Sequence, residues 1–238
     1  MRVFLSTLIT KKNIIWLYAL FIHILLGAFF VKSELYIVIR DYLGGHAPEL
    51  SDAYYHHVGF QARMSANISA DGFLFIGDSH VQGLAVPEIT RGAYNFGIGG
   101  DTTEGVIRRL QHHSINPARG AFLLIGFNDL NRRTDNEIAE NIERIIETAG
   151  NLDKLLLCSL LPTSPLFENS EEYNKRIGNI NDALKQISQK YTHVHYVDAF
   201  SALSDGEQLL DKFSSKDGIH LNPNGNKALI NLLRSHIH

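Results

Sequence analysis

The residues best suited to chemistry in this sequence lie in four short polar blocks. The first is Gly77-Asp78-Ser79, where a serine follows a short apolar run. A serine at a tight strand-to-helix turn can present its Oγ as a nucleophile, beside a helix start that favours negative charge. An ordinary helix-capping serine is the alternative. Position 81 is Val, so the G-x-S-x-G elbow of the α/β-hydrolases is disfavoured.

A second block near the C-terminus contains Asp217 and His220. Residues three apart in one helix-like turn face the same side. The aspartate can therefore accept a hydrogen bond from Nδ1 of the histidine and leave Nε2 facing a nucleophile. A surface turn with an incidental histidine is the alternative for this pair.

The other two blocks offer groups that could stabilise an oxyanion. Residues 95–103 contain three glycines in four positions, Gly97, Gly99 and Gly100, which let the backbone approach a ligand closely. Their spacing does not fit a dinucleotide loop, and a plain glycine-rich turn is the alternative. In the block from Gly126 to Asp129, Asn128 could donate its side-chain amide or could serve only in a turn. Jointly the four blocks fill every role that acyl transfer requires.

Short apolar runs alternate with longer amphipathic segments from residue 71 onward. Strands that alternate with helices predict an α/β fold with a parallel sheet, and ligands bind beyond the carboxyl ends of such strands. Each of the four blocks follows an expected strand or precedes an expected helix. The expected strands are residues 72–76, 93–96, 121–125, 154–158 and 193–197, and the expected helices are residues 102–113, 135–148, 170–191 and 223–236.

With these blocks the sequence resembles the SGNH, or GDSL-type, hydrolase superfamily, over residues 71–225. The resemblance implies a flavodoxin-like three-layer sandwich with a five-stranded parallel sheet. It implies Ser79 as nucleophile, His220 as base and Asp217 as the residue that orients the base. It assigns the oxyanion hole to the backbone N–H groups of Ser79 and Gly100 and to the side chain of Asn128. No metal or organic cofactor is implied.

Two details of sequence refine this resemblance. Position 80 is His, where many members of the superfamily have an apolar residue. Residues 95–103 look like the corresponding block of platelet-activating-factor acetylhydrolase catalytic subunits, which hints at short acyl groups. The segment 160–167, beyond the fourth expected strand, is a candidate lining for the acyl pocket.

The N-terminal region departs from the rest of the chain. Residues 14–31 are almost continuously apolar, long enough for a transmembrane helix, and Arg2, Lys11 and Lys12 precede them. We expect a cytoplasmic stub and membrane anchor over 1–31, a connector over 32–70 and a hydrolase domain over 71–238 on the extracytoplasmic side. The alternatives are a cleaved signal peptide with a secreted enzyme, and a buried helix of the domain.

The remaining features narrow the function. The net charge is −3, without the basic surplus that nucleic-acid binding requires. The adjacent pairs His56-His57 and His112-His113 lack helical metal-ligand spacing, so we interpret them as surface histidines.

We expect an enzyme that removes short acyl groups, such as acetyl, from a carbohydrate or lipid ester. An acyltransferase, a lysophospholipase or thioesterase, and a non-catalytic membrane-tethered binding module are the alternatives.

Overall fold

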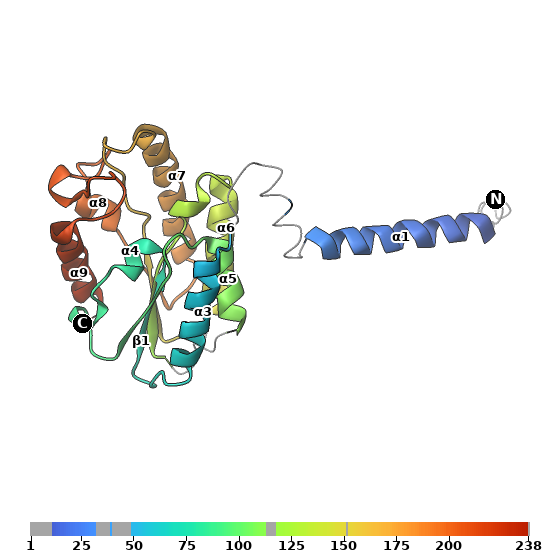
Figure 1. Cartoon of the computed structure of the whole chain (residues 1–238), viewed down its shortest axis with the longest axis horizontal. Helices are drawn as coiled ribbons and strands as arrows, with labels where there is room; N and C mark the ends of the chain where they lie inside the picture. Colours follow the sequence, from blue (N-terminus) through green and yellow to red (C-terminus); the bar gives the residue numbers. More distant parts are fainter. Residues whose placement is uncertain (1–10, 32–38, 40–48, 113–117, 151, 238) are drawn as a thin grey trace. The chain divides into compact units, whose positions relative to one another are not determined.

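The structure, a computed structural model, describes residues 11–31, 39, 49–112, 118–150 and 152–237. It divides into two compact units, Met1–Glu49 and Leu50–His238, and Figure 1 shows the whole chain. The predicted cytoplasmic stub at 1–10 and most of residues 32–48 lie outside the described residues.

The first unit contains helix α1, Lys11–Val31. Most of its large apolar side chains between Ile15 and Leu26 are exposed. Over the described part of the chain, no helix meets the length and apolarity needed to cross a membrane. The predicted transmembrane helix at residues 14–31 therefore finds no support there.

The second unit is built on a five-stranded sheet in which every neighbouring pair is parallel. The strand order is β2-β1-β3-β4-β5, which places the first strand inside the sheet. The predicted α/β fold with a five-stranded parallel sheet is confirmed. The strands are β1 (Phe73–Gly77), β2 (Ala93–Gly97), β3 (Gly120–Leu124), β4 (Lys154–Cys158) and β5 (Val194–Val197).

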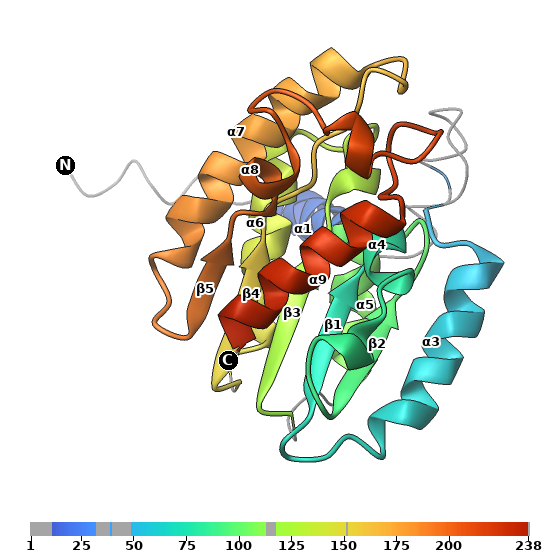
Figure 2. The same ribbon diagram turned by 90° about the vertical axis from the view of Figure 1, so that its left-hand side faces the viewer.

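Helices cover both faces of this sheet (Figure 2). Side chains alternate along a strand, so Leu74 and Ile76 enter one apolar cluster while Phe73 and Phe75 enter the other. The first cluster packs under α5 (Thr103–His112), α6 (Asp135–Thr148) and α7 (Ser170–Ser188). The second packs under α4 (Ser79–Gln82), α8 (Ala199–Leu203) and α9 (Pro223–Ile237). Three short 3-10 helices complete the unit: η1 (Val86–Glu88), η2 (Phe127–Asp129) and η3 (Asp211–Phe213).

Helix α3, Asp52–Ser65, falls within the predicted connector and belongs to the second unit. Ser51 caps it by accepting a hydrogen bond from the backbone N–H of Tyr54 at 3.2 Å. Tyr54 and Gln61 are buried, so this helix packs against the rest of the second unit.

The sheet brings the polar blocks together. Strands β2 and β3 both pair with β1, and Gly77, Gly97 and Leu124 are aligned at their carboxyl ends. The serine turn, the glycine-rich loop and the asparagine turn therefore leave the sheet side by side at one edge.

Candidate active site

A continuous hydrogen-bonded chain joins Asp217, His220 and Ser79. The Oδ2 atom of Asp217 lies 2.6 Å from Nδ1 of His220, and Nε2 of His220 lies 2.8 Å from Oγ of Ser79. A carboxylate can only accept, so Nδ1 carries a proton and Nε2 is left as an acceptor for the serine hydroxyl. The structure thus brings the three residues into the arrangement of a nucleophile, a base and an orienting acid.

The turn that carries Asp217 and His220 is fixed by its own hydrogen bonds. The second carboxylate oxygen of Asp217 accepts from the backbone N–H groups of Ile219, at 3.0 Å, and His220, at 2.9 Å. Burial raises the pKa of Asp217, but the hydrogen bonds from the side chain and backbone of His220 and from Ile219 outweigh it and hold the pKa at about 2. Asp217 is therefore ionised over the whole neutral range.

Gly218, between these two residues, has to be a glycine. Its φ is +73°, and a Cβ atom there would lie 2.4 Å from the backbone nitrogen of Phe167. The close approach lets the segment after β4 pack directly against the aspartate–histidine turn.

Ser79 is positioned by the turn between β1 and α4. Its neighbour Asp78 caps the helix by accepting from the backbone N–H of His80 at 3.0 Å. Asp78 is almost completely buried, and burial raises its pKa to about 7; the nearby Asp101 and Asp129 carboxyl groups add to the rise, and the bond from His80 opposes it. The serine itself stays partly accessible at the first position of α4.

The glycine-rich loop after β2 lies directly against this turn. A Cβ atom on Gly97 would lie 2.2 Å from the backbone nitrogen of Gln82, and one on Gly99 would lie 4.0 Å from Cβ of Ser79. Gly100 has a φ of +77°, with open space where its side chain would be. Within the described residues, the backbone N–H groups of Ser79 and Gly100 have no acceptor, so both can donate to a ligand.

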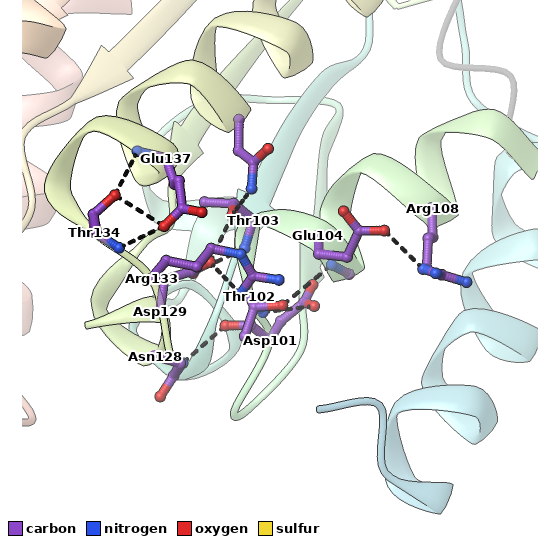
Figure 3. Close-up of polar contacts among 12 residues, drawn as sticks. Asp101, Thr102, Thr103, Glu104, Arg108, Asn128, Asp129, Arg133, Thr134 and Glu137 are labelled. Atoms are coloured by element: carbon purple, nitrogen blue, oxygen red, sulfur yellow. Dashed lines mark hydrogen bonds and ion pairs between the residues drawn. The ribbon is translucent and has the colours of Figure 1, made fainter. Parts of the chain in front are cut away.

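Asn128 joins the third block to the glycine-rich loop (Figure 3). Its Nδ2 donates to the backbone oxygen of Asp101 at 2.9 Å. An amide nitrogen carries two protons, so this bond orients the side chain and leaves a second N–H. Asn128 is the middle residue of η2, and this short helix begins directly after Gly126. The φ of Gly126 is +126°, which only glycine adopts readily.

Buried ionic groups lie next to the glycine-rich loop, and the sequence pattern does not mark them as buried or paired. Nε of Arg109, only 1% exposed, donates to Asp101 Oδ2 at 3.0 Å. Burial raises the pKa of Asp101 to about 6, with Arg109 acting against it. Asp129, also buried, accepts from the backbone and hydroxyl of Thr103 at 2.9 and 2.6 Å and from Arg133 at 2.9 Å.

Aromatic side chains border the site. The ring of His80 is centred 5.4 Å from that of His220, and burial lowers the pKa of His80 to about 4, helped by the nearby His220 and opposed by Asp217. Phe167 packs on Phe127 and Tyr173.

The segment 160–167, predicted to line the acyl pocket, is divided in its exposure. Leu160 and Leu161 are core residues, while Leu166 is exposed.

Comparison with known proteins identifies the family. The sequence profile of the GDSL-like Lipase/Acylhydrolase family matches residues 75–228. This chain belongs to that family. Platelet-activating factor acetylhydrolase IB subunit alpha2 is 30% identical in Gallus gallus over 159 residues, 62% of this chain and 68% of the relative. The Homo sapiens subunit alpha2 is 28% identical over 162 residues, 64% of this chain and 69% of the relative.

Solved structures agree with this assignment. A protein described as a platelet activating factor from Streptococcus pneumonia is 27% identical, with a TM-score of 0.70 over 79% of this chain and 94% of the other. An acetyl-xylooligosaccharide esterase from Geobacillus Stearmophilus shares the fold at 20% identity, with a TM-score of 0.57 over 71% of this chain and 94% of that one. The predicted superfamily and the predicted activity class, ester-bond hydrolysis, are confirmed.

The raised pKa of Asp78 generates a prediction on stability. An unfolded aspartate has a pKa near 3.9, so between about pH 4 and 7 the folded protein binds more protons than the unfolded chain. Stability from this group is therefore full below about pH 4 and declines as pH rises to 7. Asp78→Asn cannot ionise, so we expect its melting temperature at pH 8 to be higher than that of the wild type.

Melting temperatures at pH 5 and pH 8 check this expectation. At pH 5 the gain should be clearly smaller, because the folded wild type still holds the proton on Asp78 and has lost only the part of this stability that disappears between about pH 4 and 5. Asp71→Asn, which alters an exposed carboxyl group, is the control and should give no gain at pH 8. An equal change at both pH values for Asp78→Asn would show that this carboxyl group does not titrate as described.

Proposed function

We propose that this enzyme is a serine esterase that removes short acyl groups from a carbohydrate or lipid ester. The observation that carries the proposal is the hydrogen-bonded chain from Asp217 through His220 to Ser79. In this mechanism Ser79 is the nucleophile, His220 the general base and then acid, and Asp217 the residue that holds the ring and balances its charge.

The reaction takes place in two halves. Oγ of Ser79 attacks the ester carbonyl while Nε2 of His220 takes the hydroxyl proton, and the tetrahedral intermediate then expels the alcohol, which receives that proton. A water deprotonated by His220 attacks the acyl-enzyme and releases the acid. The pKa of Asp217, about 2, keeps a negative charge beside the imidazolium at every step.

The negative charge on the carbonyl oxygen is stabilised by the N–H groups of Ser79 and Gly100 and by the amide of Asn128. The two backbone groups have no acceptor among the described residues, and Asn128 keeps a second N–H beyond its bond to Asp101. Donors fixed before the reaction cost no reorganisation in the transition state, and one such donor is worth about 10²–10³ in rate.

Two observations support hydrolysis of small esters over the alternatives. The side chains of His220 and Asp217 are 44% and 48% exposed, which gives water a path to the base and disfavours an acyltransferase. The names of the relatives, an acetylhydrolase and an acetyl-xylooligosaccharide esterase, point to acetyl esters. A non-catalytic binding module would not need the complete chain of Asp217, His220 and Ser79.

Replacing the nucleophile tests the mechanism. Ser79→Ala should lower kcat for p-nitrophenyl acetate by about 10⁴ or more, because the remaining groups cannot form an acyl-enzyme. Ser235→Ala, which alters an exposed serine of α9, is the control and should leave kcat unchanged. Retention of more than about a hundredth of the wild-type rate by Ser79→Ala would exclude Ser79 as nucleophile.

Acyl specificity is tested with p-nitrophenyl acetate, butyrate and octanoate. We expect kcat/KM of the full chain to be highest for acetate and to fall with chain length, because the named relatives act on acetyl esters. A kcat/KM that rises toward octanoate would replace the short-acyl proposal with a lipase or lysophospholipase activity.

We also propose that α1 attaches the enzyme to a membrane, with the hydrolase fold on the extracytoplasmic side. The exposed apolar side chains of this helix and the lysines at its start support the proposal. The full chain should stay with membranes through an alkaline carbonate wash, whereas a chain lacking residues 1–31 should not. Release of the full chain, or a mature N-terminus near Glu34, would contradict the anchor and favour a secreted enzyme.

A further inference from the structure

The backbone of the glycine-rich loop after β2 is harder to fix in one position than the other parts of the site. Gly99 and Gly100 have no side chains to pack, and glycine has more backbone freedom than any other residue. An oxyanion donor has to be fixed to within a fraction of an ångström to be effective. The position of the Gly100 N–H must therefore be set by hydrogen bonds to its neighbours along the chain.

Gln82 provides one of these bonds. Its Oε1 accepts from the backbone N–H of Gly99 at 2.9 Å, and a Cβ atom on Gly99 would lie 2.7 Å from that oxygen. Gln82 is three residues after Ser79 on α4, so both residues face the same side of that helix. Asn95 fixes the backbone there, because its Nδ2 donates to the carbonyl oxygens of Val81 and Leu84 at 2.8 and 3.1 Å.

His57 of helix α3 determines which way the Gln82 amide points. Nδ1 of His57 lies 2.8 Å from the carbonyl oxygen of Ala53, which can only accept, so this nitrogen carries the proton. Nε2 of the neutral ring is then an acceptor, and Nε2 of Gln82 donates to it at 3.0 Å. With its nitrogen held by His57, the amide can only turn its oxygen toward Gly99.

The same helix holds the other side of the loop. Gln61 accepts from Arg109 at 3.2 Å, and Arg109 donates to Asp101, the residue that follows Gly100. Tyr54 donates to the backbone oxygen of Gly105 at 2.8 Å. Tyr54, His57 and Gln61 lie at spacings of three and four residues, so one face of α3 makes all of these contacts.

We propose that His57 and Gln82 are positioning residues for the oxyanion hole, and that helix α3 is thereby part of the catalytic apparatus. The proposal rests on the serine-esterase mechanism proposed above. His57 fixes the Gln82 amide, Gln82 fixes Gly99, and Gly99 sets the direction of the Gly100 N–H. Neither side chain needs to touch the substrate, so the effect is confined to the step in which charge develops.

The test compares three variants of the full chain with p-nitrophenyl acetate. Gln82→Met keeps the length of the side chain and loses both hydrogen bonds; we expect kcat to fall about 10- to 100-fold, with KM within about twofold of wild type. His57→Phe should lower kcat in the same direction by less, because Gln82 can still reach Gly99. His56→Phe is the matched control: His56 is exposed, makes no hydrogen bond to any described residue, and should behave as wild type.

A double-mutant cycle with Asn128→Ala separates positioning from general loosening of the fold. Two changes in one oxyanion hole should lower kcat by less than the product of their separate effects, whereas independent structural damage multiplies. Gln82 is exposed and His57 half-buried, so melting temperatures should stay close to wild type.

Wild-type kcat in both Gln82→Met and His57→Phe would overturn the proposal, as would a rise in KM at constant kcat or strict multiplication in the cycle. If Gln82→Met does not fold, His57→Phe decides by the same criteria. Failure of the esterase mechanism itself is distinguishable, because Ser79→Ala would then retain activity.

Discussion

The hydrogen bond between Ser79 and His220 joins residues that are 141 positions apart in the chain. At 2.8 Å it leaves little room for error in either turn, and the sheet supplies the required accuracy. The serine turn leaves the end of β1, an interior strand, where Gly77 sits so close to β3 that a Cβ atom would lie 2.1 Å from the backbone oxygen of Leu124. The histidine turn reaches the same edge through the contact of Gly218 with Phe167.

Charged side chains are buried next to the glycine-rich loop. They fix its backbone by hydrogen bonds, because its glycines have no side chains that could pack. Ionic groups in the interior are expensive to desolvate and rarely increase stability over apolar residues of the same size. Here Asp101 and Arg109 are both almost completely buried, and Asp129 is buried beside them. Each directs hydrogen bonds to a backbone or side chain of the loop, where an apolar core could not. The rise in the pKa of Asp78 is part of the same cost, because burial raises it and the nearby carboxyl groups of Asp101 and Asp129 add to the rise.

Sequence patterns predicted the sheet, because strands buried on both faces are continuous apolar runs and each is followed by polar turns. They also single out Asp217 and His220, which lie three residues apart in one turn, and Ser79, which follows the end of a strand; the structure brings all three together. Arg109 and Gln82 could not be predicted, because their partners are distant in sequence and nothing in an amphipathic helix marks one arginine as buried. The sequence predicts both His56 and His57 to be surface histidines, but His57 is half-buried and contacts Gln82 and the carbonyl oxygen of Ala53. The family match covers residues 75–228, while these long-range contacts are found only in the folded chain.

The family match begins at residue 75 and so excludes helix α3, yet α3 is hydrogen-bonded to Gly105 and Arg109 of helix α5, which directly follows the loop that borders Ser79. A helix that only linked an N-terminal segment to the enzyme would gain nothing from burying Tyr54 and Gln61, since an apolar face packs at lower cost. Their burial as hydrogen-bonded groups makes sense if the direction of the contact matters, because hydrogen bonds fix orientation where apolar contacts tolerate sliding. The catalytic unit is therefore larger than the segment that defines the family, and it begins with the helix that follows residue 50.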